Sequence, residues 1–193
     1  MREPRELFLH ELKDIYYVEK SLTKTLPRLA AETKDRELAS GLKAHLRQTE
    51  RHAKNLEKVF QRLGEPAQAE PCPGFDGIKQ EHDEFMKERP SQEVLDVFLT
   101  GAAARTEHYE IAAYTGLVTL AKAMGESQAA KLLEQNLKQE KETLRKVEQI
   151  GRRLSKSVAR NGRVATRSRT STSSRRRAST RSRRVTARAA SPS

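Results

Sequence analysis

The fold class of this chain is decided by residues 95–117, which read LDVFLTGAAARTEHYEIAAYTGL. Apolar and small side chains recur here every three or four residues, which is the spacing of one face of an α-helix. Glu107 and Glu110 stand three residues apart, so their carboxylates project from the same side of that helix. Glu110 lies within the apolar stripe and Glu107 lies beside it. The stretch therefore predicts a core-facing helix that carries two carboxylates on its buried side.

The same periodicity, together with residues that begin and end helices, predicts the other elements. The helix that contains residues 95–117 is expected to span residues 91–125. The other helices are expected at residues 7–31, 35–63, 77–87 and 127–154. Pro27 lies inside the first pattern and is expected to kink that helix or end it early. No window shows sustained strand alternation. Four long helices predict an all-α four-helix bundle, and the long link between the second and third lets the chain cross over the bundle.

The composition excludes several classes of protein. The chain has 193 residues, which is enough for one domain with a hydrophobic core. A single cysteine, Cys72, excludes a disulfide framework within the chain and any all-cysteine metal site, and its loop position predicts an exposed thiol. No apolar run approaches the roughly 20 residues of a membrane span, and the N-terminus lacks the apolar stretch of a signal peptide. We therefore expect a cytoplasmic protein without membrane insertion.

The charge of the chain is divided unevenly along its length. Residues 1–150 hold 24 basic residues and all 26 acidic residues, a net charge of −2. Residues 151–193 hold 14 basic residues and no acidic residue, so the net charge of +12 comes from this segment. The division predicts two parts, a helical bundle over residues 1–150 and a cationic tail over residues 151–193.

The tail combines arginine with serine and threonine and has no aromatic residue. It has too little apolar surface to offset its ordering entropy, so we expect it to be disordered on its own. Its arginines are expected to neutralise DNA phosphates without reading base sequence. Binding to an acidic membrane surface or another polyanion, and a solubilising role, are the alternatives. The predicted nucleic-acid-binding residues are Arg163, Arg167, Arg169, Arg175, Arg176, Arg177, Arg181, Arg183, Arg184 and Arg188.

Three more glutamates stand in or beside apolar stripes. Glu19 falls within the stripe of the first helix, and Glu140 lies between leucines in the last helix. Glu50 lies at the edge of the stripe of the second helix. Each is near the middle of its helix, as is the glutamate pair of the third long helix, and antiparallel neighbours bring their midpoints to a similar depth. The sequence therefore predicts that five carboxylates converge inside the bundle.

Five buried carboxylates cannot all stay ionised without a counter-charge. Two divalent metal ions supply it in ferritin-like bundles, whose inward-facing glutamates hold two iron or two manganese ions. We therefore predict a dinuclear metal centre, with iron or manganese as the metal. The predicted ligands are Glu19, Glu50, Glu107, Glu110 and Glu140.

Several separate motifs resemble the YciE/YciF group of ferritin-like bacterial stress proteins. They are residues 9–20, LHELKDIYYVEK, then His45-Leu46 and Thr49-Glu50, then residues 107–114, EHYEIAAY. The resemblance covers about residues 5–150 and leaves the tail out. It implies a ferritin-like bundle with a dinuclear metal-binding motif, a homodimer and a link to general stress.

The wider ferritin and rubrerythrin pattern has a Glu-x-x-His motif on the second and on the fourth long helix, and the chain departs from both. Three residues after Glu50 and Glu140 stand Ala53 and Thr143 instead of histidines. His52 is one position short of the expected place, about 100° around the helix, and is expected to reach a metal only if the helix is distorted. The departures imply an all-carboxylate site, which suits hard metal ions.

Two kinds of function are compatible with these patterns. One is a stress-response protein that sequesters ferrous iron or oxidises it with dioxygen or peroxide, a ferroxidase- or peroxidase-like activity. The alternative is a non-enzymatic structural or DNA-associated helical dimer whose metal site is degenerate. His45 is interpreted as a hydrogen-bonded core residue in either case. A tail that binds DNA would place the protein at the nucleoid.

Overall fold

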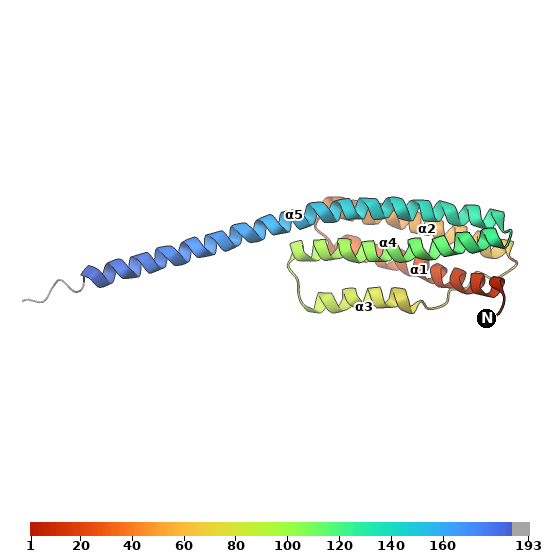
Figure 1. Ribbon diagram of the computed structural model, residues 1–193, viewed down its shortest axis with the longest axis horizontal. Helices are drawn as coiled ribbons and strands as arrows, with labels where there is room; N and C mark the ends of the chain where they lie inside the picture. The colour runs from red at the N-terminus through yellow and green to blue at the C-terminus, as the bar shows by residue number, and fades with distance from the viewer. Residues whose placement is uncertain (187–193) are drawn as a thin grey trace, which may run out of the picture. The chain divides into compact units, whose positions relative to one another are not determined.

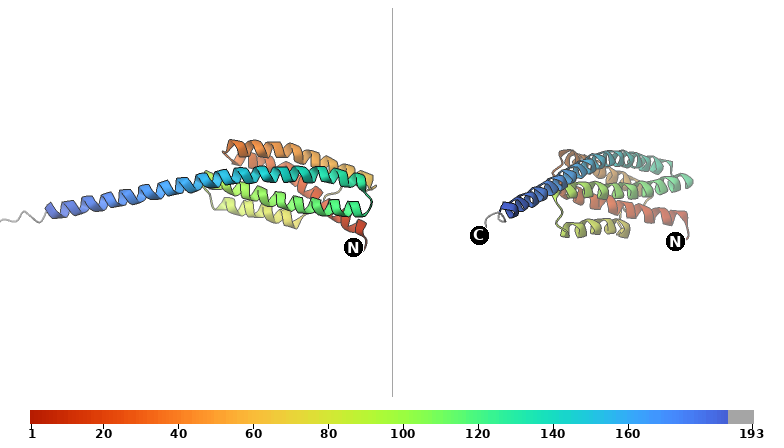
Figure 2. Two further views of the ribbon diagram at one scale, coloured as in Figure 1. Left: turned by 45° about the horizontal axis from the view of Figure 1, so that its top comes forward. Right: turned by 60° about the vertical axis from the view of Figure 1, so that its left-hand side comes forward.

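The computed structural model describes residues 1–186, and the side chains of residues 1–161. The helices of this part are α1 (Pro4–Glu32), α2 (Arg36–Arg62), α3 (Pro73–Lys87), α4 (Gln92–Ala123) and α5 (Ser127–Thr186). The helices α1, α2, α4 and the first part of α5 lie side by side, and α3 lies in the connection between α2 and α4 (Figure 1 and Figure 2). The prediction of an all-α four-helix bundle with a long crossover is confirmed. None of these helices combines the length and the apolar character that crossing a bilayer requires.

Side chains and glycines at the helix ends explain where the long helices begin and stop. The backbone N–H of Leu38 donates to the side chain of Asp35 at 2.9 Å at the start of α2. The helices α2 and α4 are followed by Gly64 and Gly125, whose φ values of 71° and 78° are readily adopted by glycine. The bundle therefore has short, defined turns, except at the crossover that contains α3.

The hydrophobic core follows the predicted stripes. Leu12 and Ile15 on α1, Leu56 on α2 and Leu133 on α5 are fully buried, and Leu117 on α4 is 1% exposed. Because each helix contributes an apolar side above and below its midpoint, mostly apolar side chains surround the middle of the bundle. These surroundings make the charged residues at the midpoints chemically important.

Pro27 does not end α1, contrary to one of the two outcomes that the sequence predicts. The helix continues through Pro27 to Glu32. Proline removes one backbone hydrogen bond from a helix, but Leu26 and Ala30 on either side are buried in the core. Their burial offsets the missing bond.

Cys72 is buried rather than exposed, so the prediction of an accessible thiol is wrong. Its side chain is 1% exposed. The sulfur accepts a hydrogen bond from the Phe75 backbone N–H at 3.4 Å at the start of α3 and lies 2.9 Å from the Tyr109 hydroxyl. Burial raises the pKa of the Cys72 thiol, which keeps it in its unreactive form.

The bundle extends beyond residue 150, where the sequence places its end. Leu154 is buried, and Arg153 binds Asp35 at 2.7 Å and Glu37 at 3.0 Å. The helix α5 continues to Thr186. Residues 151–186 contain glycine only at positions 151 and 162 and no proline, so few residues in this range interrupt a helix. The ten predicted nucleic-acid-binding arginines lie beyond the residues whose side chains are described.

Asp96 ties the turn between α1 and α2 to α4. One of its carboxylate oxygens accepts hydrogen bonds from the Thr33 hydroxyl at 2.7 Å, the Lys34 backbone N–H at 3.3 Å and the Gln92 side-chain amide at 3.0 Å. Asp96 is 6% exposed. A buried acceptor that serves three donors holds this end of the bundle together.

Replacing Asp96 by alanine is expected to lower the free energy of unfolding by about 2–3 kcal/mol, because the buried Thr33 hydroxyl and two less buried donors lose their acceptor. Chemical denaturation measures the change. Thr119→Ala, an exposed position on the same helix, is the matched control and should change stability by less than about 0.5 kcal/mol. Equal effects of the two substitutions would contradict the role assigned to Asp96.

Candidate metal centre

Four of the five predicted glutamates meet in the middle of the bundle. Glu19 on α1, Glu110 on α4 and Glu140 on α5 are fully buried, and Glu107 on α4 is 1% exposed. They come from three helices whose other buried residues are mostly apolar. The structure therefore brings together the carboxylates that the sequence places at helix midpoints.

The buried ligands form two groups that share one residue. His45, Glu107, Glu110 and Glu140 offer ligand atoms that all lie within 4.8 Å of one another. Glu19, His52 and Glu140 form a second group of the same kind. Because Glu140 belongs to both, the two positions are neighbours. This is the arrangement that a dinuclear centre with a shared carboxylate requires.

Glu50 does not take part, and its prediction as a ligand is wrong. Its side chain is exposed on α2. Thr49 beside it is fully buried, so the core-facing side of α2 passes through Thr49 rather than Glu50. Adjacent residues of a helix differ by about 100° in direction, so a small error in the position of the stripe moved Glu50 into the predicted core.

Helix α2 instead supplies two histidines. His45 and His52 are 4% and 1% exposed, and both belong to the groups of candidate ligands. No helix distortion is needed, contrary to the expectation for His52, because α2 buries both His52 and Ala53 and its stripe is wider than one residue. The signal was present in the sequence, since two histidines seven residues apart lie on one side of a helix.

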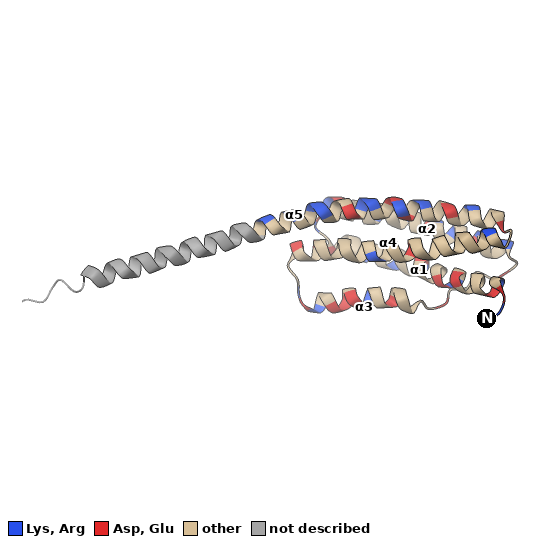
Figure 3. Cartoon of the chain, in the orientation of Figure 1, with Lys and Arg blue, Asp and Glu red and all other residues tan. Residues whose placement is uncertain are grey.

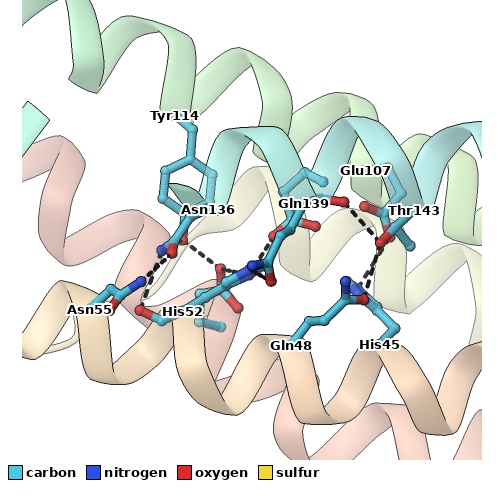
Figure 4. A network of polar contacts seen from close by, with 11 residues as sticks. His45, Gln48, His52, Asn55, Glu107, Tyr114, Asn136, Gln139 and Thr143 are labelled. Carbon is cyan, nitrogen blue, oxygen red and sulfur yellow. Dashed lines mark hydrogen bonds and ion pairs between the residues drawn. The ribbon is translucent and has the colours of Figure 1, made fainter. Parts of the chain in front are cut away.

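His52 is oriented by a hydrogen bond on the side away from the carboxylates. Its Nε2 lies 3.1 Å from the side-chain oxygen of Gln139, which can only accept, so Nε2 carries a hydrogen (Figure 4). Its Nδ1 lies 3.3 Å from Glu19 Oε1 and 2.6 Å from Glu140 Oε1. Histidine ligands of metals are commonly held in this way, with the second ring nitrogen bonded to an oxygen.

A second layer of polar side chains fixes Glu19. The Tyr114 hydroxyl donates to Glu19 Oε1 at 2.5 Å, and the side-chain amide of Asn136 donates to the Tyr114 oxygen at 3.0 Å. The same Asn136 accepts from the side chain of Asn55 at 2.9 Å (Figure 4). Sequence reasoning missed Asn136 and Gln139, because each reaches the centre only through another side chain.

Glu110 is the least satisfied residue of the centre. Among the described residues, neither of its two carboxylate oxygens has a hydrogen-bond partner, and the side chain is fully buried. Desolvation, together with the nearby charges of Glu140, Glu19 and Glu107, raises the pKa of Glu110 well above its usual value. A buried carboxylate without a donor is strongly unfavourable unless a proton or a cation neutralises it.

The other groups divide into those that keep a proton and those that lose it. Burial raises the pKa of Glu19 to about 7 and that of Glu107 well above its usual value. Burial alone would lower the pKa of His52, but its contacts with Glu140 and Glu19 outweigh burial and raise it to about 10. Burial opposes ionisation of Glu140 too, yet His52 lowers the pKa of that carboxyl. The metal-free centre is therefore neutralised by protons.

The residues fit two divalent cations. Four carboxylates supply four negative charges, and two imidazoles supply neutral nitrogen ligands. A mixed set of oxygen and nitrogen ligands suits iron, manganese or zinc better than calcium or magnesium, which prefer oxygen alone. The implied all-carboxylate site is thus replaced by a site with two histidines.

In the metal-free chain, the free energy of unfolding is expected to fall as the pH rises from about 5 to about 7. The folded state keeps protons on Glu19, Glu107 and Glu110 at pH values where the unfolded chain has released them, so a rising pH favours unfolding. Each such group contributes about 1.4 kcal/mol per pH unit. Chemical denaturation in the presence of a chelator measures the slope.

Glu110→Gln removes one of these groups and keeps its volume, so it should flatten the slope by about 1.4 kcal/mol per pH unit. Glu50→Gln, on the exposed side of α2, should leave the slope unchanged. A wild-type stability that rises over this pH range would contradict the assignment of buried protonated carboxyls.

Comparisons with known proteins agree with this architecture. The family model described as "Domain of unknown function (DUF892)" matches residues 3–160. Protein YciF of Escherichia coli is 35% identical to this chain over 144 residues, which are 74% of this chain and 87% of YciF.

Solved structures extend the likeness to three dimensions. The crystal structure of the E. coli stress protein YciF has a TM-score of 0.77 and 33% identity, and the match covers 81% of this chain and 99% of YciF. YcfI of Rhodopseudomonas palustris has a TM-score of 0.74 and 36% identity, with 76% of this chain and 94% of YcfI covered. The family match, the sequence identity and the shared bundle together show that this chain belongs to the DUF892 family and is a relative of YciF.

Proposed function

We propose that this chain binds a dinuclear metal centre, with iron or manganese as the metal, and that it oxidises or sequesters iron. The observation that carries the proposal is the pair of unpartnered oxygens of fully buried Glu110. They lie in a group of four mutually close ligands from three helices. A purely structural core would gain from an apolar residue at this position, because an unpartnered buried carboxyl opposes folding.

Each ligand has a distinct part in this proposal. Glu140 would serve both metal positions, with Glu19 and His52 holding one ion and His45, Glu107 and Glu110 holding the other. Two bound metal ions of variable oxidation state would supply the electrons for reducing dioxygen or peroxide. The protein holds the ligands in place through Gln139 and Tyr114 and surrounds them with mostly apolar residues.

The two histidines favour the redox function over a degenerate, non-enzymatic site. An all-carboxylate site suits metal ions that do not change oxidation state as well as those that do. Imidazole ligands from His45 and His52 shift the preference toward iron and other transition metals. The relative YciF is described as a stress protein, and we propose the same setting for this chain, as a cytoplasmic homodimer.

Glu110→Gln is expected to weaken metal binding by at least about tenfold and to slow ferrous iron oxidation, because a charged ligand is lost. Glu50→Gln, at an exposed position on α2, should leave both unchanged. Metal content after anaerobic loading and absorbance of ferric iron after exposure to air measure the two effects. Wild-type protein that retains no metal after loading would overturn the proposal.

We propose in addition that the arginines of residues 163–188 bind DNA without sequence preference. The support is the concentration of positive charge, since residues 151–193 hold 14 basic residues and no acidic residue. Lysine and arginine also stand along α5 within the bundle (Figure 3), and α2 holds seven of these residues against three glutamates, whereas α3 holds four acidic residues and two lysines. The test must therefore separate the tail from the bundle surface.

Replacing the ten predicted arginines by glutamine is expected to weaken binding to a short duplex at least about 100-fold near physiological salt, because counterion release is lost. The dependence of affinity on salt should flatten as well. Replacing Lys54 and Lys58, exposed on α2, by glutamine is the control and should have a much smaller effect. DNA binding that survives in the ten-residue variant would place the contact on the bundle.

A further inference from the structure

A cavity of about 90 Å³ lies between the helices beside the candidate metal centre. Residues of all five helices line it within the bundle, and its walls are mostly apolar. Leu22 and Leu26 come from α1, Leu42 from α2, and Val147 and Ile150 from α5. Apolar walls favour an apolar ligand, as an enclosed apolar cavity of about 150 Å³ binds benzene. A volume of about 90 Å³ therefore suits a chain of about four carbon atoms.

The cavity reaches the ligands of the metal centre at one end. His45 and Glu107 are among its lining residues, and both are at least nine-tenths buried. The Glu107 Oε2 atom has no hydrogen-bond partner among the described residues. The inner end therefore combines apolar walls with an unsatisfied polar atom.

Two small residues of α2 line the cavity at a place that is exposed to solvent. Gly41 and Ala44 line the cavity and are exposed. A Cβ atom added at Gly41 would meet only Ile150 Cδ1, at 3.9 Å. A chain bound in the cavity can therefore reach solvent here.

The lining of the cavity also carries an exposed cation. Lys146 lines the cavity and is exposed, and within the described part of the chain no acidic group lies within salt-bridge distance of it. The other two lining cations are already paired, because Lys79 lies 2.8 Å from Asp76 and Arg28 lies 3.3 Å from Asp83. An anionic head group would therefore be placed at Lys146.

We propose that this cavity binds a short aliphatic carboxylate, with its chain between the helices and its carboxylate at Lys146. The chain end would lie near His45 and Glu107, next to the metal position that these residues share. The proposal goes beyond iron oxidation, because it assigns the bundle an organic ligand. It does not depend on bound metal, so the two proposals fail separately.

The affinity is expected to follow the length of the chain. Each methylene added from butanoate to hexanoate should strengthen binding about fourfold, until the cavity is filled. The full chain, with and without chelator, is titrated with each carboxylate, and nuclear magnetic resonance of labelled leucine and valine methyl groups monitors binding. Hexanoate should shift the signals of Leu42 and Val147 and show cross-relaxation with them.

Two matched pairs of variants test the placement. Gly41→Leu fills the opening and should weaken hexanoate binding at least tenfold, whereas Gly116→Leu, at an open position on α4 outside the lining, should leave it unchanged. Lys146→Met should weaken hexanoate and spare hexanol, whereas Lys141→Met should affect neither. Ala44→Leu replaces Gly41→Leu if that variant does not fold.

Hexanoate that shifts no signal of Leu42 or Val147, or that binds Gly41→Leu as tightly as wild type, would overturn the proposal. Equal loss of hexanoate and hexanol binding in Lys146→Met would overturn the placement of the carboxylate.

Discussion

Four carboxylates lie at the middle of a bundle whose surrounding side chains are mostly apolar. Their negative charge cannot remain in this place without compensation, because desolvation and mutual repulsion both oppose it. The rest of the centre can be understood as a response to this constraint. His52 stands between Glu19 and Glu140, and Tyr114 donates to Glu19.

Protons and metal ions are alternative solutions to the same problem. Without metal, His52 holds a proton, and burial raises the pKa of Glu107 and Glu110 so that they are protonated too. With two divalent cations, the same ligands are needed as bases, since imidazole and carboxylate bind metal in their deprotonated forms. Metal binding at this centre would therefore be coupled to proton release. Because mostly apolar residues surround the carboxylates, the negative charge of the centre must be balanced within the centre itself, either by protons or by metal ions.

Much of this centre could be predicted from the sequence. Glu19 and Glu140 have apolar neighbours one turn before and after, so their burial follows from helical periodicity alone. The position of Glu107 and Glu110 on the same side of their helix follows from their spacing of three residues. The error at Glu50 and the misplacement of His52 have one cause, because the direction of a stripe read from sequence is uncertain by about one residue, or about 100°. His45 was predicted to lie in the core, but as a hydrogen-bonded residue rather than as a ligand.

Other features depend on contacts between segments far apart in the chain. Gln139 and Asn136 act through His52 and Tyr114, and no local pattern marks such residues. The burial of Cys72 depends on packing that includes Tyr109, 37 positions later. The cavity, too, arises from small side chains on different helices, which periodicity describes only as part of the core.

The competition between metal ions and protons for the same ligands can be measured directly. Calorimetric titration of the full, metal-free chain with Mn²⁺ near neutral pH, repeated in buffers of different ionisation enthalpy, counts the metal ions bound and the protons released. We expect about two metal ions per chain and the release of several protons, from His52, Glu107, Glu110 and in part Glu19. Binding without proton release, or no binding, would contradict a metal centre built from these residues.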